Sequence, residues 1–93
     1  MDSVDLGLLR AVVRVAEVGS ITGAAPGLGY SQPGLSQRVQ SVERALGCEV
    51  FDRHSHGVRL TEVGARVLPY ARVLLAVAEA MADEVATIGR AGG

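Results

Sequence analysis

The chain is poor in several residue types, and each shortage excludes a class of protein. Its 93 residues contain no Lys, no Trp and one Cys, Cys48. A single cysteine cannot form a disulfide within the chain. Only Tyr30, Phe51 and Tyr70 are aromatic, so a core must be built mainly from Val, Leu and Ala. No apolar run approaches the roughly 18 residues that span a membrane.

The first residues also lack the pattern of a secretory signal. Asp2 and Asp5 stand where such a signal carries basic side chains. Together with the lone cysteine, this predicts a cytoplasmic protein with no membrane partner.

The charge is nearly balanced, whereas proteins that bind nucleic acids are usually basic. The net charge is −1, and residues 31–66 form the only net-positive section, with five Arg against four acidic residues. Every basic residue is Arg, which suits bidentate contacts with phosphate and guanine. Composition therefore leaves DNA binding open, and the order of the residues must decide.

The first half of the chain predicts three helices in a single domain. Residues 4–18 carry apolar side chains at spacings of three and four, with Ser3 or Asp5 as N-cap and a glycine at the end. Residues 20–28 predict a short helix that Pro26 would bend. Residues 31–47 predict a strong helix, with Ser31 as N-cap and Pro33 in the first turn. Its apolar stripe consists of Leu35, Val39, Val42 and Leu46.

The second half predicts a hairpin and a long helix. Residues 50–51 and 58–60 favour two short strands joined by a polar loop. A helix from Thr61 to about Ile88 follows, with a local bend at Pro69. Its apolar positions recur at alternating spacings of four and three, the pattern of a helix-pairing seam. The predicted dimer interface comprises Val67, Ala71, Leu74, Ala78, Met81, Val85 and Ile88.

Two helices joined by a tight turn, the second with a polar face, are typical of a helix-turn-helix. The second helix of such a unit lies in the DNA major groove. Its polar face here offers Gln32, Ser36, Gln37 and Gln40. Glutamine pairs with adenine, and serine serves donors or acceptors. A solvated helix face has the same pattern, so periodicity alone leaves both interpretations open.

An ordered set of short motifs decides between them. The set consists of Gly19-Ser20-Ile21-Thr22-Gly23-Ala24-Ala25, Leu28, Ser31-Gln32-Pro33-Gly34-Leu35-Ser36, Glu43, Leu46-Gly47, Phe51-Asp52-Arg53 and the run from Gly57 to Gly64. Single pieces are common, but the full set at these spacings closely resembles the N-terminal domain of LysR-type transcription regulators. The resemblance extends from Leu6 to the long last helix. The order Ser36-Gln37-Arg38 is similar to a subset of that family, where many members have Ser-Arg-Gln.

The resemblance implies a mainly α fold: a winged helix-turn-helix of three helices and a short two-stranded wing over residues 1–60. A dimerising linker helix and a short glycine-containing tail would occupy residues 61–93. Arg53 would be the wing residue at the minor groove, with Thr22 and Arg38 near the DNA backbone. The full set of DNA-binding residues implied is Thr22, Ser31, Gln32, Pro33, Ser36, Gln37, Arg38, Gln40 and Arg53.

The implied function is sequence-specific binding of double-stranded DNA at inverted repeats by a homodimer that activates or represses transcription. No cofactor, metal or small-molecule site is expected, since His54 and His56 are predicted loop residues and Cys48 a small buried side chain. Nothing in the 93 residues predicts the large effector-binding domain into which family members continue. An excised domain and a natural short protein both remain open.

Two other function classes compete with DNA binding. The chain could be an interaction module that pairs through residues 67–88 with a full-length regulator and modulates it, since its net charge is only −1. An enzyme is disfavoured, because the sequence has no nucleophile–base pair, metal-ligand cluster or phosphate-binding glycine loop.

Overall fold

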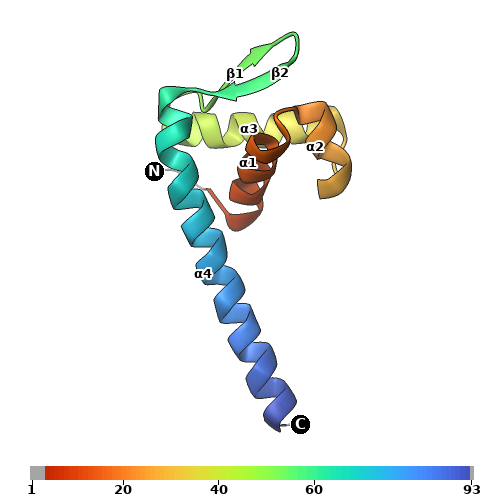
Figure 1. Cartoon of the computed structure of the whole chain (residues 1–93), viewed down its shortest axis with the longest axis vertical. Coiled ribbons are helices and arrows are strands. Elements are labelled where there is room, and N and C mark those ends of the chain that lie inside the picture. Colours follow the sequence, from red (N-terminus) through yellow and green to blue (C-terminus); the bar gives the residue numbers. More distant parts are fainter. Residues whose placement is uncertain (1–3, 93) are drawn as a thin grey trace.

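The computed structural model describes residues 4–92 as a helical head, a β-hairpin and one long helix (Figure 1). The head contains α1 (Leu6–Val18), α2 (Ile21–Leu28) and α3 (Gln32–Leu46). The hairpin pairs β1 (Phe51–His54) with β2 (Gly57–Leu60) as an antiparallel wing, and α4 (Glu62–Gly92) runs away from the head. This is the winged helix-turn-helix with a linker helix that the sequence predicts.

The helices begin and end where the sequence places their caps. The Asp5 carboxylate accepts a hydrogen bond from the Leu8 amide at 2.8 Å, while the alternative cap Ser3 lies outside the described residues. Ser20 and Ser31 cap α2 and α3 in the same way. Each of α1 to α3 stops at a glycine in the left-handed conformation, which costs glycine little; these are Gly19, Gly29 and Gly47.

The core lies where α1, α2 and α3 cross beneath the start of the wing. Leu35 and Val39 of α3 are fully buried, with Val42 1% exposed, so the predicted stripe faces the core. Val12 and Val15 of α1 pack in the same cluster. Burying one face of α3 leaves its opposite face in solvent.

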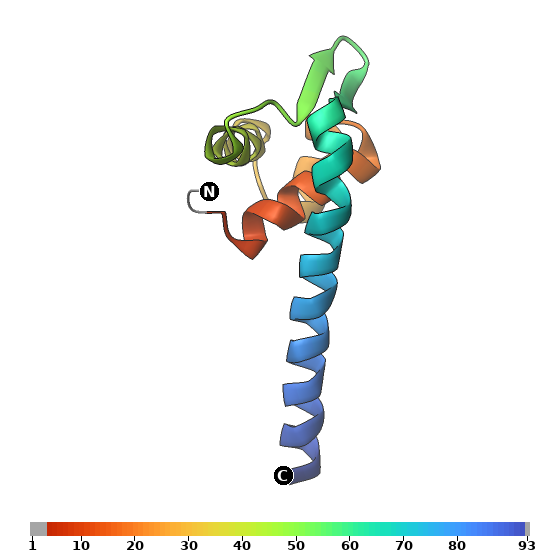
Figure 2. The same cartoon turned by 90° about the vertical axis from the view of Figure 1, so that its left-hand side faces the viewer.

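Both prolines inside helices are accommodated. α2 includes Pro26 and α4 includes Pro69 without interruption. Figures 1 and 2 show α4 as one continuous helix without a sharp kink. Pro69 has no N–H, so the Ala65 carbonyl lacks its helical hydrogen-bond donor. Both residues are exposed, so water can solvate that carbonyl.

The wing is longer than the sequence predicts. Four residue pairs form the ladder, from Phe51 opposite Leu60 to His54 opposite Gly57. Residues 52–54 are polar and exposed, so they lack the apolar alternation that marks a strand. The wing is held to the head because the Val58 amide donates to the Gly19 carbonyl at 3.0 Å.

The base of α4 is fixed to both the wing and α1. The Thr61 hydroxyl caps the helix by accepting from the Gly64 amide at 3.0 Å, and it also donates to the Glu49 carbonyl at 2.7 Å. A second apolar cluster joins Val13 of α1 to three buried residues of α4: Leu68, Ala71 and Leu75. The helix continues to Gly92, beyond the predicted end at Ile88, while Gly93 lies outside the described residues. Within the described part of the chain, no helix is long and apolar enough to cross a membrane.

Candidate nucleic-acid interface

The outer face of α3 presents the polar side chains that the sequence singles out. Pro33, Gln37 and Gln40 are exposed on the side opposite the buried stripe, and Ser36 is half-buried beside the wing. This face carries uncharged donors and acceptors able to read base edges. The charged Arg44 extends it toward the end of the helix.

The start of α3 shares an open groove with α2 and the wing. The groove is lined by Thr22 of α2, Gln32 of α3 and, from the wing, Arg53 and His56. Thr22 and Gln32 are exposed. The Ser31 side chain lies at the start of α3, where it caps the helix. The fold therefore brings together residues that are up to 34 positions apart in the sequence.

Arg53 lies on β1 and reaches back to α3. Its Nη1 donates a hydrogen bond to Ser36 Oγ at 2.9 Å, which links the wing to the polar face. The tip of the wing is formed instead by Ser55 and His56. In the described structure, Arg53 stands at the junction between the two elements.

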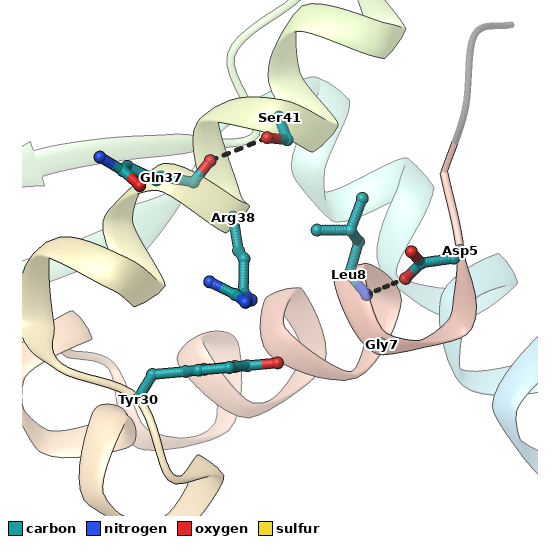
Figure 3. Close-up of a pocket in the computed structure, with 7 residues that line it drawn as sticks. All are labelled: Asp5, Gly7, Leu8, Tyr30, Gln37, Arg38 and Ser41. Atoms are coloured by element: carbon teal, nitrogen blue, oxygen red, sulfur yellow. Dashed lines mark hydrogen bonds between the residues drawn. The ribbon is translucent and has the colours of Figure 1, made fainter.

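Arg38 is set apart from the exposed face. Its guanidinium carbon lies 4.0 Å from the centre of the Tyr30 ring, and Nη1 donates to the Gly34 carbonyl at 3.3 Å. Figure 3 shows this stack in a hollow between α3 and the start of α1, with the Asp5 carboxylate on the far side. The side chain is half-buried, so it borders the interface while Gln37 stands in it.

Glu43 links α3 to the start of the wing, a structural role that the sequence does not predict. Its Oε2 accepts hydrogen bonds from the Val50 amide at 2.7 Å and the Phe51 amide at 3.3 Å. The carboxylate thus ties the last turns of α3 to the start of β1. Glu43 belongs to the ordered motif set of the sequence, but neither that set nor its position seven residues ahead of Val50 identifies such a bond.

The two histidines lie together at the wing tip: His56 is in the turn, as predicted, whereas His54 is the last residue of β1, so its prediction as a loop residue is wrong. The His56 amide donates a hydrogen bond to His54 Nδ1 at 3.2 Å. Cys48 is exposed, so its prediction as a buried side chain is wrong. It follows the turn at Gly47, and the chain enters the core only at Val50. In the part of the chain that the structure describes, no group of three or more His, Cys, Asp or Glu is arranged to hold a metal.

The residues of the predicted seam of α4 differ in their exposure. Leu74, Met81, Val85 and Ile88 are 52–66% exposed. Val67 and Ala78 are half-buried. Ala71 is 1% exposed because it packs on its own head, at the edge of an apolar groove. Three further exposed apolar residues were missed: Tyr70, Val73 and Val77.

Comparison with known proteins gives a consistent result. The family described as "Bacterial regulatory helix-turn-helix protein, lysR family" matches residues 6–65. A regulator from Azotobacter vinelandii, named for the ibpB-leuC intergenic region, is 43% identical over 75 residues, 81% of this chain and 52% of its own length. The small neutral protease regulatory protein of Streptomyces coelicolor is 42% identical over 90% of this chain and 28% of its own. The chain thus spans from about a quarter to about half of these relatives.

Solved structures share the fold over nearly the whole chain. The BenM DNA-binding domain in complex with catB site 1 DNA superposes with a TM-score of 0.87 at 35% identity, covering 92% of this chain and 97% of the other. The CbnR DNA-binding domain in complex with DNA superposes with a TM-score of 0.85 at 30% identity, covering 92% and 99%. Those domains were solved on DNA.

Proposed function

Because the chain belongs to the LysR family of bacterial helix-turn-helix regulatory proteins, we propose that it binds double-stranded DNA in a sequence-specific manner, as a homodimer, to regulate transcription. The observation that carries the proposal is the polar, uncharged face of α3 beside a groove shared with α2 and the wing. We place the protein in the cytoplasm and assign it no catalytic activity, since the family is one of regulators.

The outer face of α3 would enter the major groove. Gln37 and Gln40 are exposed and one turn apart, so both can reach base edges, where glutamine pairs with adenine through N6 and N7. The amides at the start of α3, beside Ser31, Gln32 and Pro33, would hold a backbone phosphate. Thr22 flanks the same groove and would contact the backbone.

Beside α3, the wing would lie against the adjoining backbone and minor groove. Its tip exposes Ser55 and His56, while Arg53 stands closer to α3. Arg38 would contact the DNA backbone from the other side of α3, where its stacking on Tyr30 restricts how far the side chain can extend.

The exposed stripe of α4 would form the dimer. From Tyr70 to Ile88 it extends about 27 Å at about 1.5 Å per residue, too much apolar surface for one helix to leave in water. It continues into an apolar groove between α1, α3 and α4, lined by Leu9, Leu46 and Tyr70 among others. An antiparallel pair with Leu74 opposite Met81 of the second copy would bring that copy's Ile88 to the groove.

The charges of α4 favour the antiparallel arrangement. Its first half carries Arg66 and Arg72 against Glu62, while its second half carries Glu79, Asp83 and Glu84 against Arg90. In the same register, the more basic half of each helix would lie alongside the more acidic half of the other. A parallel pair would place like charges side by side, which destabilises the interface.

Selection from random DNA tests the proposal. The chain is incubated with a pool of random duplexes, bound DNA is sequenced, and affinities follow from fluorescence anisotropy at several salt concentrations. We expect an enriched inverted repeat with half-sites about one helical turn apart. Ser36→Ala/Gln37→Ala should lose the preference, and Thr87→Ala, far along α4, should keep it. Binding without enrichment that vanishes in modest salt would contradict sequence-specific binding.

An interaction module is the second candidate function, favoured by the net charge of −1 and the long exposed stripe. In this function the chain pairs through α4 with a full-length regulator and modulates it. It would form dimers or heterodimers yet bind no DNA at low salt. The same anisotropy titration therefore separates the two functions.

A further inference from the structure

The hydrogen bonds of the Ser36 hydroxyl differ from those of two other helix hydroxyls, Ser41 and Thr87. A serine hydroxyl offers one proton and two lone pairs. Ser41 and Thr87 each donate their proton to the carbonyl four residues earlier, at 3.0 and 2.9 Å. Ser36 accepts from Arg53, and no carbonyl of the described residues takes its proton. The Ser36 proton is therefore available to a ligand at the polar face.

Arg53 biases this hydroxyl toward donation. Its guanidinium is always charged, and its 2.9 Å bond to Ser36 Oγ fills one of the two lone pairs. A charged donor repels the hydroxyl proton and polarises the O–H bond, which strengthens its next hydrogen bond. The Ser36 proton is thus turned away from the wing, on the side where α3 is open.

We infer that Arg53 is a positioning residue for base specificity, which holds Ser36 as a hydrogen-bond donor toward the DNA. The inference rests on the proposed function and assigns the bases that this part of the site selects. In the major groove guanine presents two acceptors, adenine presents N7 and thymine presents O4. Cytosine presents only its N4 donor. The Arg53–Ser36 pair therefore discriminates against cytosine at the base that Ser36 reaches.

The geometry of the wing favours this role. Arg53 and Val58 face each other in the β ladder, and the Val58 amide is held by the Gly19 carbonyl at 3.0 Å. Glu43 fixes the start of β1 to α3 at 2.7 Å. The two ends of the Arg53–Ser36 bond thus belong to elements that are fastened to each other.

The test measures base discrimination in four variants after selection has defined the operator. Affinities of the wild type, Ser36→Ala, Arg53→Met and the double variant are measured for operators with each base at each half-site position. We expect Ser36→Ala to reduce discrimination against cytosine at one position by about five- to tenfold, the effect of one hydrogen bond. Arg53→Met should reduce it at the same position, and the double variant should lose no more than Ser36→Ala alone.

Two further variants separate positioning from charge and folding. Arg53→Lys keeps a charged donor and should restore part of the discrimination. Arg59→Met removes the same charge from the opposite face of the hairpin, so it should weaken binding to every sequence equally and leave discrimination intact. Circular dichroism melting verifies that each variant is folded.

Three results would overturn the inference while leaving the proposed function in place. Arg53→Met could weaken all sequences equally and flatten the salt dependence, which would make Arg53 a phosphate contact. It could alter discrimination at a different position, which would make it a direct reader. Ser36→Ala could change no position at all. A wild-type chain that enriches no sequence would instead contradict the proposed function and remove the basis of the inference.

Discussion

The guanidinium of Arg38 lies flat against the ring of Tyr30, with its central carbon 4.0 Å from the ring centre. The contact joins the turn after α2 to α3, because Tyr30 directly precedes the N-cap Ser31. Tyr30 also packs against the main core from this position. The stack therefore fixes the angle at which α3 leaves the turn.

Removal of the Tyr30 ring should destabilise the head. Tyr30→Ala loses both the core contact and the cation–π contact, so the free energy of unfolding should fall by about 2–4 kcal/mol. Tyr30→Phe keeps the ring and should change it by less than about 1 kcal/mol. Urea denaturation at one fixed protein concentration measures both. A double-mutant cycle with Arg38→Ala should give a coupling of about 0.5–1 kcal/mol, and zero coupling would contradict the stack.

A methyl group at Gly64 should disrupt the junction of α4 and the wing. A Cβ there would overlap the Val50 carbonyl oxygen, so Gly64→Ala should cost about 1–3 kcal/mol. Gly89 is the matched control, since a Cβ at this position of the same helix meets nothing. Gly89→Ala should stabilise by up to about 1 kcal/mol. Thermal melting compares the two, and equal effects would show that the junction is not tight.

A charge in the exposed stripe of α4 should break the proposed dimer. Met81 is 63% exposed and central in the stripe, so Met81→Glu would bury two carboxylates in a symmetric interface. We expect the dimer dissociation constant to rise at least about 100-fold, measured by sedimentation equilibrium. Ala86→Glu adds the same charge on the opposite side of α4 and should leave the association nearly unchanged. Dimers that survive Met81→Glu would place the interface elsewhere.

Loss of the Glu43 carboxylate should loosen the wing before it unfolds the head. Glu43→Ala leaves the amides of Val50 and Phe51 without their acceptor, at a cost of about 1–3 kcal/mol. Glu43→Gln keeps one acceptor oxygen and should cost less. Hydrogen exchange of the Val50 and Phe51 amides should accelerate in both variants, and the rate should rise more in Glu43→Ala than in Glu43→Gln. Unchanged exchange in Glu43→Ala would mean that the carboxylate does not hold the strand.

Local chemistry in the sequence predicts most of the fold. Asp5, Ser20 and Ser31 are capping residues whose side chains can bond only nearby amides, so their positions define helix starts. The buried stripe of α3 follows from its period. Cys48 could not be placed in this way, because a turn at Gly47 separates it from both patterns.

Contacts between distant elements were not predictable from the pattern. The Arg53–Ser36 bond depends on the register of the hairpin and the direction of its twist, which residue types do not define. On α4, Leu68 and Leu75 face the head while Tyr70 and Val77 face outward. The repeat of four and three residues does not separate these two faces, so it includes Ala71, which packs on the head, together with exposed residues such as Met81.

α4 is one continuous helix from its anchor on the head to the end of its exposed stripe. Each residue inserted into such a rod turns everything beyond it by about 100° and advances it by about 1.5 Å. The orientation of the stripe relative to the head therefore depends on the number of residues between them. A single insertion after Leu75 would rotate the part of the stripe beyond it out of line with the part before it, whereas a seven-residue insertion would nearly restore the phase and move the distal part about 10 Å farther out. The number of residues in this rod, together with their sequence, thus sets how far apart two paired heads can stand.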